Sequence, residues 1–158
     1  MGGNTNTQDF AYYVPNIGAG HAIAKEKSDA KNPVHFKPFK HSQTSSIHTG
    51  VPFNDTNWRL IFAEKGQAIL RDHLIGLQCG NEPDCYLSHG HCAEPYGPTG
   101  YSNEFAALVT AIQNDPQIPM KKMLIGPSLA SGLWSPEQLW ETGYLERFKG
   151  SLTEVTME

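Results

Sequence analysis

Two adjacent polar residues, Asn81 and Glu82, end a short apolar run and are followed at once by Pro83. Over 74–80 apolar residues alternate with Gly and Gln, which is the period of a β-strand, and Pro83 forbids further ladder bonding. The alternating apolar residues are Ile75, Leu77 and Cys79. Gly80 lets the backbone turn or approach a ligand closely. The sequence therefore predicts a buried strand that delivers a carboxylate and an amide to a site.

The place of Glu82 is compatible with proton-transfer chemistry. Barrels of alternating strands and helices carry catalytic groups at the carboxyl ends of their strands, because the strand holds the side chain while the following loop shapes a cleft. Glu82 could donate and accept a proton there, and Asn81 could hydrogen-bond a sugar hydroxyl in either direction. The alternative is that Glu82 is an ordinary loop carboxylate that caps the next segment, and Asn-Glu-Pro alone leaves both interpretations open.

A second set of chemically capable side chains follows in the same loop. It comprises Cys85, His89, His91 and Cys92. Imidazole and thiolate groups bind zinc, but the spacing lacks the paired C-x-x-C pattern typical of zinc sites. With three cysteines in the chain, at least one stays unpaired unless it forms a disulfide with another chain. The alternating strand position of Cys79 predicts a small residue of the core.

The segment Gly80-Asn81-Glu82-Pro83-Asp84, with Tyr86 and His89-Gly90 after it, resembles the acid/base strand of glycoside hydrolase family 79, the heparanase-like and fungal β-glucuronidase group. Three further segments resemble strand ends of that family, in the family's order. They are Gly2-Gly3-Asn4-Thr5 (second strand), Gly50-Val51-Pro52-Phe53-Asn54-Asp55-Thr56 (third) and Ile125-Gly126-Pro127-Ser128-Leu129-Ala130 (fifth). Four segments in order are more specific than any one motif.

The resemblance implies an α/β fold, a partial (β/α)8 TIM barrel with roughly strands 2 to 5, over residues 1–158. It implies a retaining glycosidase that acts on a carbohydrate, a glucuronide or related glycoconjugate, without metal or cofactor, and with Glu82 as the acid/base residue. The substrate-binding residues that it implies are Asn81, Asn4 and Tyr86. Without the resemblance, the local sequence favours an asparagine in a turn at Asn4 over a substrate-binding residue. Full-length relatives are expected to be secreted.

The family's nucleophilic glutamate lies on a seventh strand, and the sequence predicts that this chain ends before the sixth. We therefore expect half of a two-carboxylate site and no turnover by this chain alone. A non-catalytic, carbohydrate-binding pseudo-enzyme is the alternative, in which Tyr101 and Trp134 would offer stacking surfaces. Both aromatic residues could equally belong to the core.

Length and composition agree with a soluble fragment. The chain has 158 residues, whereas a (β/α)8 barrel takes about 250. Twelve basic against 16 acidic residues give a net charge of −4, which favours neither nucleic acid nor an anionic membrane as partner. No signal peptide follows Met1, and no apolar run is long enough to span a bilayer. We expect a truncated or mis-started reading frame, and 16–48 to be irregular and to depart from the family pattern.

Helices are expected between the strands. The first has its cap among 54–56 and an apolar face made by Trp58, Ile61, Phe62, Ile69 and Leu70. The second is capped by Ser102, ends at 114–116 and has an apolar stripe made by Phe105, Leu108, Val109 and Ile112. A strand over 123–125 follows, and then a helix with its cap at Ser135 that ends near Gly143. Its buried side has Leu139 and Trp140, and the stripe continues with Leu145 and Phe148.

Overall fold

The computed structural model describes residues 11–13, 23–25, 34–36, 47–51, 60–130 and 132–157. The first three of these segments form a small sheet of three-residue strands, β1 (Ala11–Tyr13), β2 (Ile23–Lys25) and β3 (Val34–Phe36). β3 lies in the middle, parallel to β1 and antiparallel to β2. The sequence predicts an irregular segment over 16–48, so β2, β3 and the first two residues of the strand Ile47–Val51 differ from that expectation. Pairing between distant segments, and not a local pattern, makes them strands.

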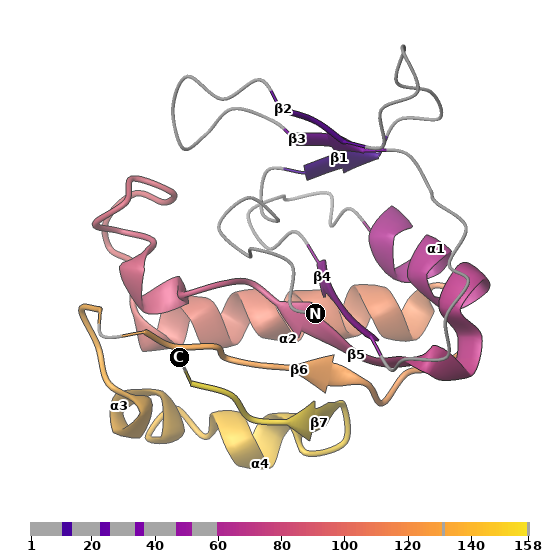
Figure 1. Cartoon of the computed structure of the whole chain (residues 1–158). Helices are drawn as coiled ribbons and strands as arrows, with labels where there is room; N and C mark the ends of the chain where they lie inside the picture. The colour runs from indigo at the N-terminus through magenta and orange to yellow at the C-terminus, as the bar shows by residue number, and fades with distance from the viewer. Residues whose placement is uncertain are drawn as a thin grey trace.

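The main sheet has four parallel strands in chain order (Figure 1). They are β4 (Ile47–Val51), β5 (Leu74–Cys79), β6 (Leu124–Ile125) and β7 (Leu152–Glu154). The strands expected after residue 73 and around 123–125 are confirmed as β5 and β6. β7 corrects the expectation that the chain ends before another strand forms, because Leu152 and Glu154 pair with β6.

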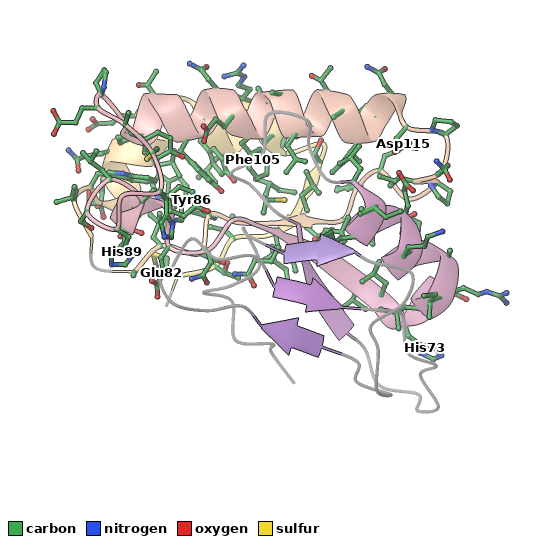
Figure 2. All side chains as sticks on the ribbon, turned by 90° about the horizontal axis from the view of Figure 1, so that it is seen from above. His73, Glu82, Tyr86, His89, Phe105 and Asp115 are labelled. Carbon is green, nitrogen blue, oxygen red and sulfur yellow. The ribbon has the colours of Figure 1, made fainter. Side chains whose placement is uncertain are left out.

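Helices connect successive strands, as parallel pairing requires. They are α1 (Ile61–Leu70), the 3₁₀ turns η2 (Arg71–His73) and η3 (Pro83–Cys85), α2 (Pro98–Asn114), α3 (Pro136–Trp140) and α4 (Tyr144–Phe148). In both views α2 runs along one side of the main sheet (Figures 1 and 2). None of the helices in the described segments is long and apolar enough to cross a bilayer.

The long helix α2 confirms its predicted apolar stripe and end but begins earlier than expected. Phe105, Leu108 and Ile112 are fully buried, and the helix ends at Asn114. Its N-cap is Gly97 with Pro98 in the first turn, so Ser102 lies inside the helix and is buried. Proline suits this start because its ring fixes a helical φ and the first turn needs no N–H from it.

Helix α1 buries a different face from the one predicted. Its N-cap is Leu60 without a side-chain cap, so the expected cap among 54–56 is wrong; Trp58 lies outside the described residues. Ala63 and Gln67 are the buried residues, while Ile69 is exposed. Leu60 and Leu70 pack against the core, so the buried stripe has helical spacing but includes a polar side chain.

The core is continuous from β5 through α2 to α4. Leu74, Leu77 and Cys79 are buried in β5, but Ile75 is 42% exposed, contrary to the predicted alternation. Ile75 is the second residue of the strand and lies at the register shift with β4, where Ile47 pairs with Leu74 and His48 with Gly76. In α4, Tyr144 rather than Leu145 joins Phe148 in the core. The capping box of Ser135 and Gln138 confirms the predicted start of α3, and Leu139 is buried as expected.

Candidate functional site

Glu82 lies just beyond the carboxyl end of β5, where the chain makes two left-handed steps. Gly80 has φ 78°, and Glu82 itself has φ 50° and ψ 53°. The N–H of Glu82 donates to the carbonyl oxygen of Ser128 (3.0 Å), and its carbonyl accepts from the N–H of Cys85 (2.9 Å). A left-handed non-glycine residue costs free energy and persists only where its surroundings hold it. Glu82 is held in this way, with a half-buried side chain.

The loop after β6 has the same unusual backbone. Ser128 has φ 53°, and its hydroxyl hydrogen-bonds that of Thr156 (2.8 Å). The N–H of Ser128 donates to the carbonyl of Thr156 (3.0 Å). The segments that follow β5, β6 and β7 are therefore tied together at one edge of the sheet, in the order Glu82, Ser128, Thr156.

Asn81 and Tyr86 are buried residues close to Glu82 in the same loop. Asn81 is 5% exposed, and its backbone N–H donates to the phenol oxygen of Tyr86 (3.2 Å). Tyr86 is buried and its ring lies 5.4 Å from that of His91 and 5.9 Å from that of Tyr96. The structure thus brings Asn81, Glu82 and Tyr86 together, with Tyr86 supporting the backbone of Asn81. Asn4 lies outside the described residues.

Asp84 is a site residue that the sequence analysis did not single out. Its carboxylate is 1% exposed and accepts from the N–H of Ala130 (3.1 Å) and of Gly132 (2.6 Å). Its carbonyl oxygen accepts from the N–H of Leu133 (3.0 Å). The local sequence Glu-Pro-Asp does not distinguish Asp84 from an ordinary turn aspartate. Only the folded structure shows that Asp84 joins the loop after β5 to the loop after β6.

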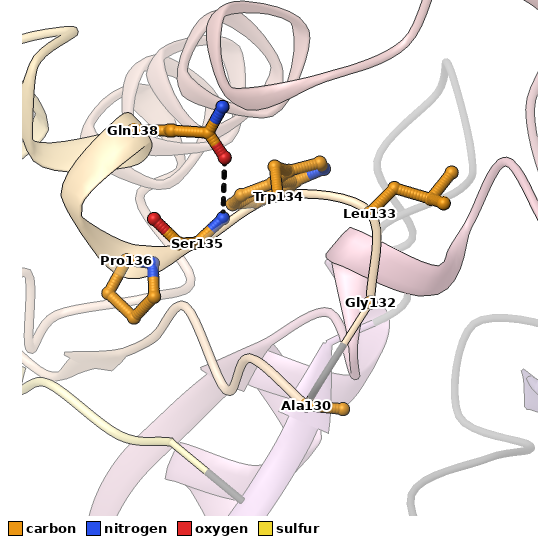
Figure 3. A pocket seen from close by; sticks show the side chains of 7 residues that line it. All are labelled: Ala130, Gly132, Leu133, Trp134, Ser135, Pro136 and Gln138. Carbon is orange, nitrogen blue, oxygen red and sulfur yellow. Dashed lines mark hydrogen bonds between the residues drawn. The ribbon is translucent and has the colours of Figure 1, made fainter.

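An open cavity of about 480 Å³ lies beside the loop that Asp84 holds (Figure 3). Its lining residues are Ala130, Gly132, Leu133, Trp134, Ser135, Pro136 and Gln138. None of these lining side chains is charged. The N–H of Ser135 donates to Oε1 of Gln138 (2.8 Å), which fixes one wall. Tyr101 is wholly buried and is a core residue, so it offers no stacking surface. Trp134 belongs to the core cluster and also lines the cavity.

The structure places one further carboxylate on a strand. Glu154 is the last residue of β7 and pairs with Ile125, which pairs with Gln78. In the register of the sheet, Glu154 is therefore level with Gln78, which precedes Glu82 by four residues. Their strands, β7 and β5, are two positions apart in the sheet, which separates them by about 10 Å. A glutamate here was not expected, because the sequence predicts that the chain ends before another strand forms. Its register does not place it beside Glu82.

The remaining glutamates of the described segments have other surroundings. Glu94, Glu137, Glu141 and Glu146 are exposed. Glu104 accepts a hydrogen bond from the Tyr96 hydroxyl (2.7 Å), and burial raises the pKa of its carboxyl although this bond opposes the shift.

The Cys/His loop does not assemble a metal site within the described residues, where no three potential ligands of this kind gather. The rings of His89 and His91 lie 5.7 Å apart. Burial raises the pKa of Cys85, with smaller contributions from Asp84 and Glu82. Burial, with Glu104 second, raises the pKa of Cys92 to about 11. Burial makes both thiols weaker acids than an exposed cysteine, so forming the thiolates that bind zinc would cost more free energy here.

No protein-family model matches the chain, and no curated protein matches it. Neither comparison bears on the resemblance to family 79. The geometry around Glu82 is therefore the basis for assigning a function.

Proposed function

We propose that this chain carries the acid/base half of a retaining glycosidase site of the family 79 type, with Glu82 as the acid/base residue and a β-glucuronide as substrate. The observation that carries the proposal is the backbone of Glu82. It follows a buried parallel strand, adopts a left-handed conformation and is tied to the end of the next strand at Ser128. Strain of this kind concentrates at functional sites, where it aims a side chain.

The sheet supports this assignment. Strands β4 to β7 neighbour one another in chain order, and helices lie between them in the sequence. A segment of a (β/α)8 barrel has this order, and the carboxyl ends of its strands carry the catalytic groups. We propose on this ground that the main sheet belongs to a partial barrel, with β5 as the strand that bears the acid/base residue.

The chemistry assigned to Glu82 is proton transfer. Its carboxyl group would protonate the glycosidic oxygen as the bond to the anomeric carbon breaks, and would then deprotonate the attacking water. Asn81, buried beside it, would hold a sugar hydroxyl through its amide. In a retaining site a second carboxylate stands about 5 to 5.5 Å away. The described carboxylate on β7, Glu154, is not placed there by its register, so we expect no turnover without an added nucleophile.

Chemical rescue tests this proposal on the chain itself. Azide would attack the anomeric carbon of 4-methoxyphenyl β-glucuronide, the bond to the phenol oxygen would break, and Glu82 would give that oxygen its proton. The products are α-glucuronyl azide and 4-methoxyphenol, measured by chromatography. Without azide we expect no phenol release.

The matched variants are Glu82→Gln and Glu94→Gln, since Glu94 is an exposed carboxylate of the same loop. Loss of a general acid costs about 10²- to 10⁴-fold for a poor leaving group. We expect that loss for Glu82→Gln and none for Glu94→Gln. Equal rates in both variants, or no azide product from the unsubstituted chain, would contradict the proposal.

A carbohydrate-binding pseudo-enzyme is the second candidate. The position of Glu154, away from Glu82, favours it over an enzyme that is complete in this chain. Three results together would select this candidate. Nuclear magnetic resonance would show saturable binding of phenyl β-glucuronide, the Asn81→Ala variant would bind it more weakly, and the azide experiment would give no product.

A further inference from the structure

Four hydrogen bonds join the loop after β5 to the loop after β6. One is donated by Glu82 N–H to the Ser128 carbonyl (3.0 Å). The other three end on Asp84: Ala130 and Gly132 N–H groups donate to its carboxylate (3.1 and 2.6 Å), and Leu133 N–H donates to its carbonyl (3.0 Å). We call these three the Asp84 clamp. Both oxygens of a buried carboxylate are thereby satisfied by backbone amides.

The clamp leaves no room at Gly132. A Cβ atom there would lie 2.5 Å from the Asp84 carbonyl oxygen and 2.7 Å from Oδ2 of its carboxylate. Real Cβ atoms do not approach backbone so closely, so any side chain at this position must push the two loops apart. By contrast, a Cβ atom at Gly150, after α4, would meet nothing within 4 Å. The close approach at Gly132 shows that the position of Asp84 depends on the opposite loop.

The clamp is mechanically connected to Glu82. Only Pro83 separates the two residues, and its ring restricts the chain between them. The 3₁₀ turn η3 contains Asp84 and is closed by Cys85 N–H donating to the Glu82 carbonyl (2.9 Å). A movement of Asp84 is therefore transmitted to the left-handed backbone of Glu82, which would otherwise relax toward a less strained conformation.

We propose that Asp84 is a positioning residue for Glu82: it holds the acid/base carboxyl in its strained orientation by anchoring its loop to Ala130, Gly132 and Leu133. This inference rests on the proposed function of Glu82 as a general acid. It assigns Asp84 no contact with substrate. A general acid displaced by about 1 Å loses up to about 10²-fold in rate, so the clamp would contribute to catalysis through distance alone.

The first test compares Asp84→Asn and Gly132→Ala with the control Gly150→Ala in the azide-assisted cleavage of a series of aryl β-glucuronides. A displaced acid matters most for poor leaving groups. We expect a loss of about 10- to 100-fold with 4-methoxyphenol and little loss with dinitrophenol, and no change in Gly150→Ala. An equal loss across the series, or no loss, would overturn the proposal, because a merely structural clamp lowers the amount of active protein equally for all substrates.

The second test does not need turnover. Amide hydrogen exchange in Gly132→Ala should accelerate at Glu82 N–H by about tenfold or more, as well as at 132 and 133. Faster exchange confined to 130–133, with Glu82 unchanged, would overturn the positioning role. If exchange at Glu82 accelerates, but Glu82→Gln cleaves the aryl β-glucuronides with azide as fast as the unsubstituted chain does, the coupling stands and the proposed function fails. If Asp84→Asn and Gly132→Ala both unfold globally, the clamp serves the stability of the whole fold, and the proposal is overturned.

Discussion

The two ends of the main sheet are held by different devices. At the carboxyl end, the non-glycine residues Glu82 and Ser128 both have positive φ, and a buried carboxylate ties their loops together. At the amino end, Gln67 of α1 makes both hydrogen bonds of an amide pair with Met120: its Nε2 donates to the Met120 carbonyl (2.9 Å), and Met120 N–H donates to its Oε1 (3.0 Å). A buried carboxylate therefore holds the carboxyl end, and this neutral amide pair holds the amino end.

The amino end also has a non-glycine residue with positive φ. Arg71, with φ 48° and ψ −123°, is exposed and joins α1 to η2, and it lies outside the left-handed helical region that Glu82 occupies. Lys121 donates to the carbonyl oxygens of Ile112 (2.7 Å) and Asp115 (2.6 Å), which satisfies the end of α2. In α/β sheets, ligands bind outside the carboxyl ends of the parallel strands. From this difference between the two ends, we expect substitutions at the amino end to affect stability and substitutions at the carboxyl end to affect function.

Thiol reactivity gives the largest expected effect and tests how closed the carboxyl-end loop is. Burial, assisted by Glu104, raises the pKa of Cys92 to about 11. Against an ordinary thiol pKa near 8.5, the thiolate fraction at pH 8 is lower by about 10²-fold. We expect Cys92 to react with iodoacetamide slower by about that factor than in the urea-unfolded chain, as measured by mass spectrometry.

The sign of the pH dependence follows from the same shift. The folded state keeps the Cys92 proton to a higher pH than the unfolded chain does, so this group's contribution to stability is complete below about pH 8.5 and is lost as the pH rises toward 11. The denaturation midpoint should therefore fall over this window and fall less in Cys92→Ser. Rapid labelling at pH 8 in the folded state would show that the loop is open.

Gln67→Met probes the amino-end pair. Methionine keeps the volume but removes both hydrogen bonds with Met120, so the free energy of unfolding should fall by about 2 kcal/mol. Urea denaturation measures this, and Gln113→Met on the exposed side of α2 is the control with little expected change. Glu82-dependent cleavage by the folded fraction should stay unchanged. A loss of that cleavage would end the distinction between the two ends.

Glu82→Gly probes the strain at the carboxyl end. Glycine adopts positive φ without a steric cost, so the free energy of unfolding should rise by about 1 kcal/mol while Glu82-dependent cleavage disappears. Glu154→Gly, in an extended strand, should instead lower it by about 0.5 kcal/mol. If both substitutions destabilise the chain, Glu82 is not held under strain.

Lys121→Met gives the smallest expected effect. It removes the cation that bonds the last carbonyl groups of α2, and should lower the free energy of unfolding by about 0.5 kcal/mol. Lys122→Met removes a neighbouring, exposed cation and should be neutral. High salt should shrink the difference between the two variants in urea denaturation. Indistinguishable midpoints would show that solvent already satisfies these carbonyl groups.

Much of the second half of the fold could be predicted because its elements have strong local patterns. The stripe of α2, with Phe105, Leu108 and Ile112, repeats with the helical period. Ser135-Pro136 matches the start of a helix, with Ser135 as the cap and proline in the first turn. The strand before Glu82 is apolar and ends at a proline. Such signals depend on neighbouring residues only, so the sequence by itself determines them.

Tertiary structure decided the rest. Ile75 and Leu145 are apolar yet exposed, and Gln67 is polar yet buried, because burial depends on what another element offers to each position. The strands β2, β3 and β7 have only three residues each and depend on partners from elsewhere in the chain. The Asp84 clamp joins residues 46 and 48 positions apart. The sequence alone determined that a glutamate follows a strand, and only folding determined which groups hold it there, since a hydrogen bond between distant residues leaves no periodic trace.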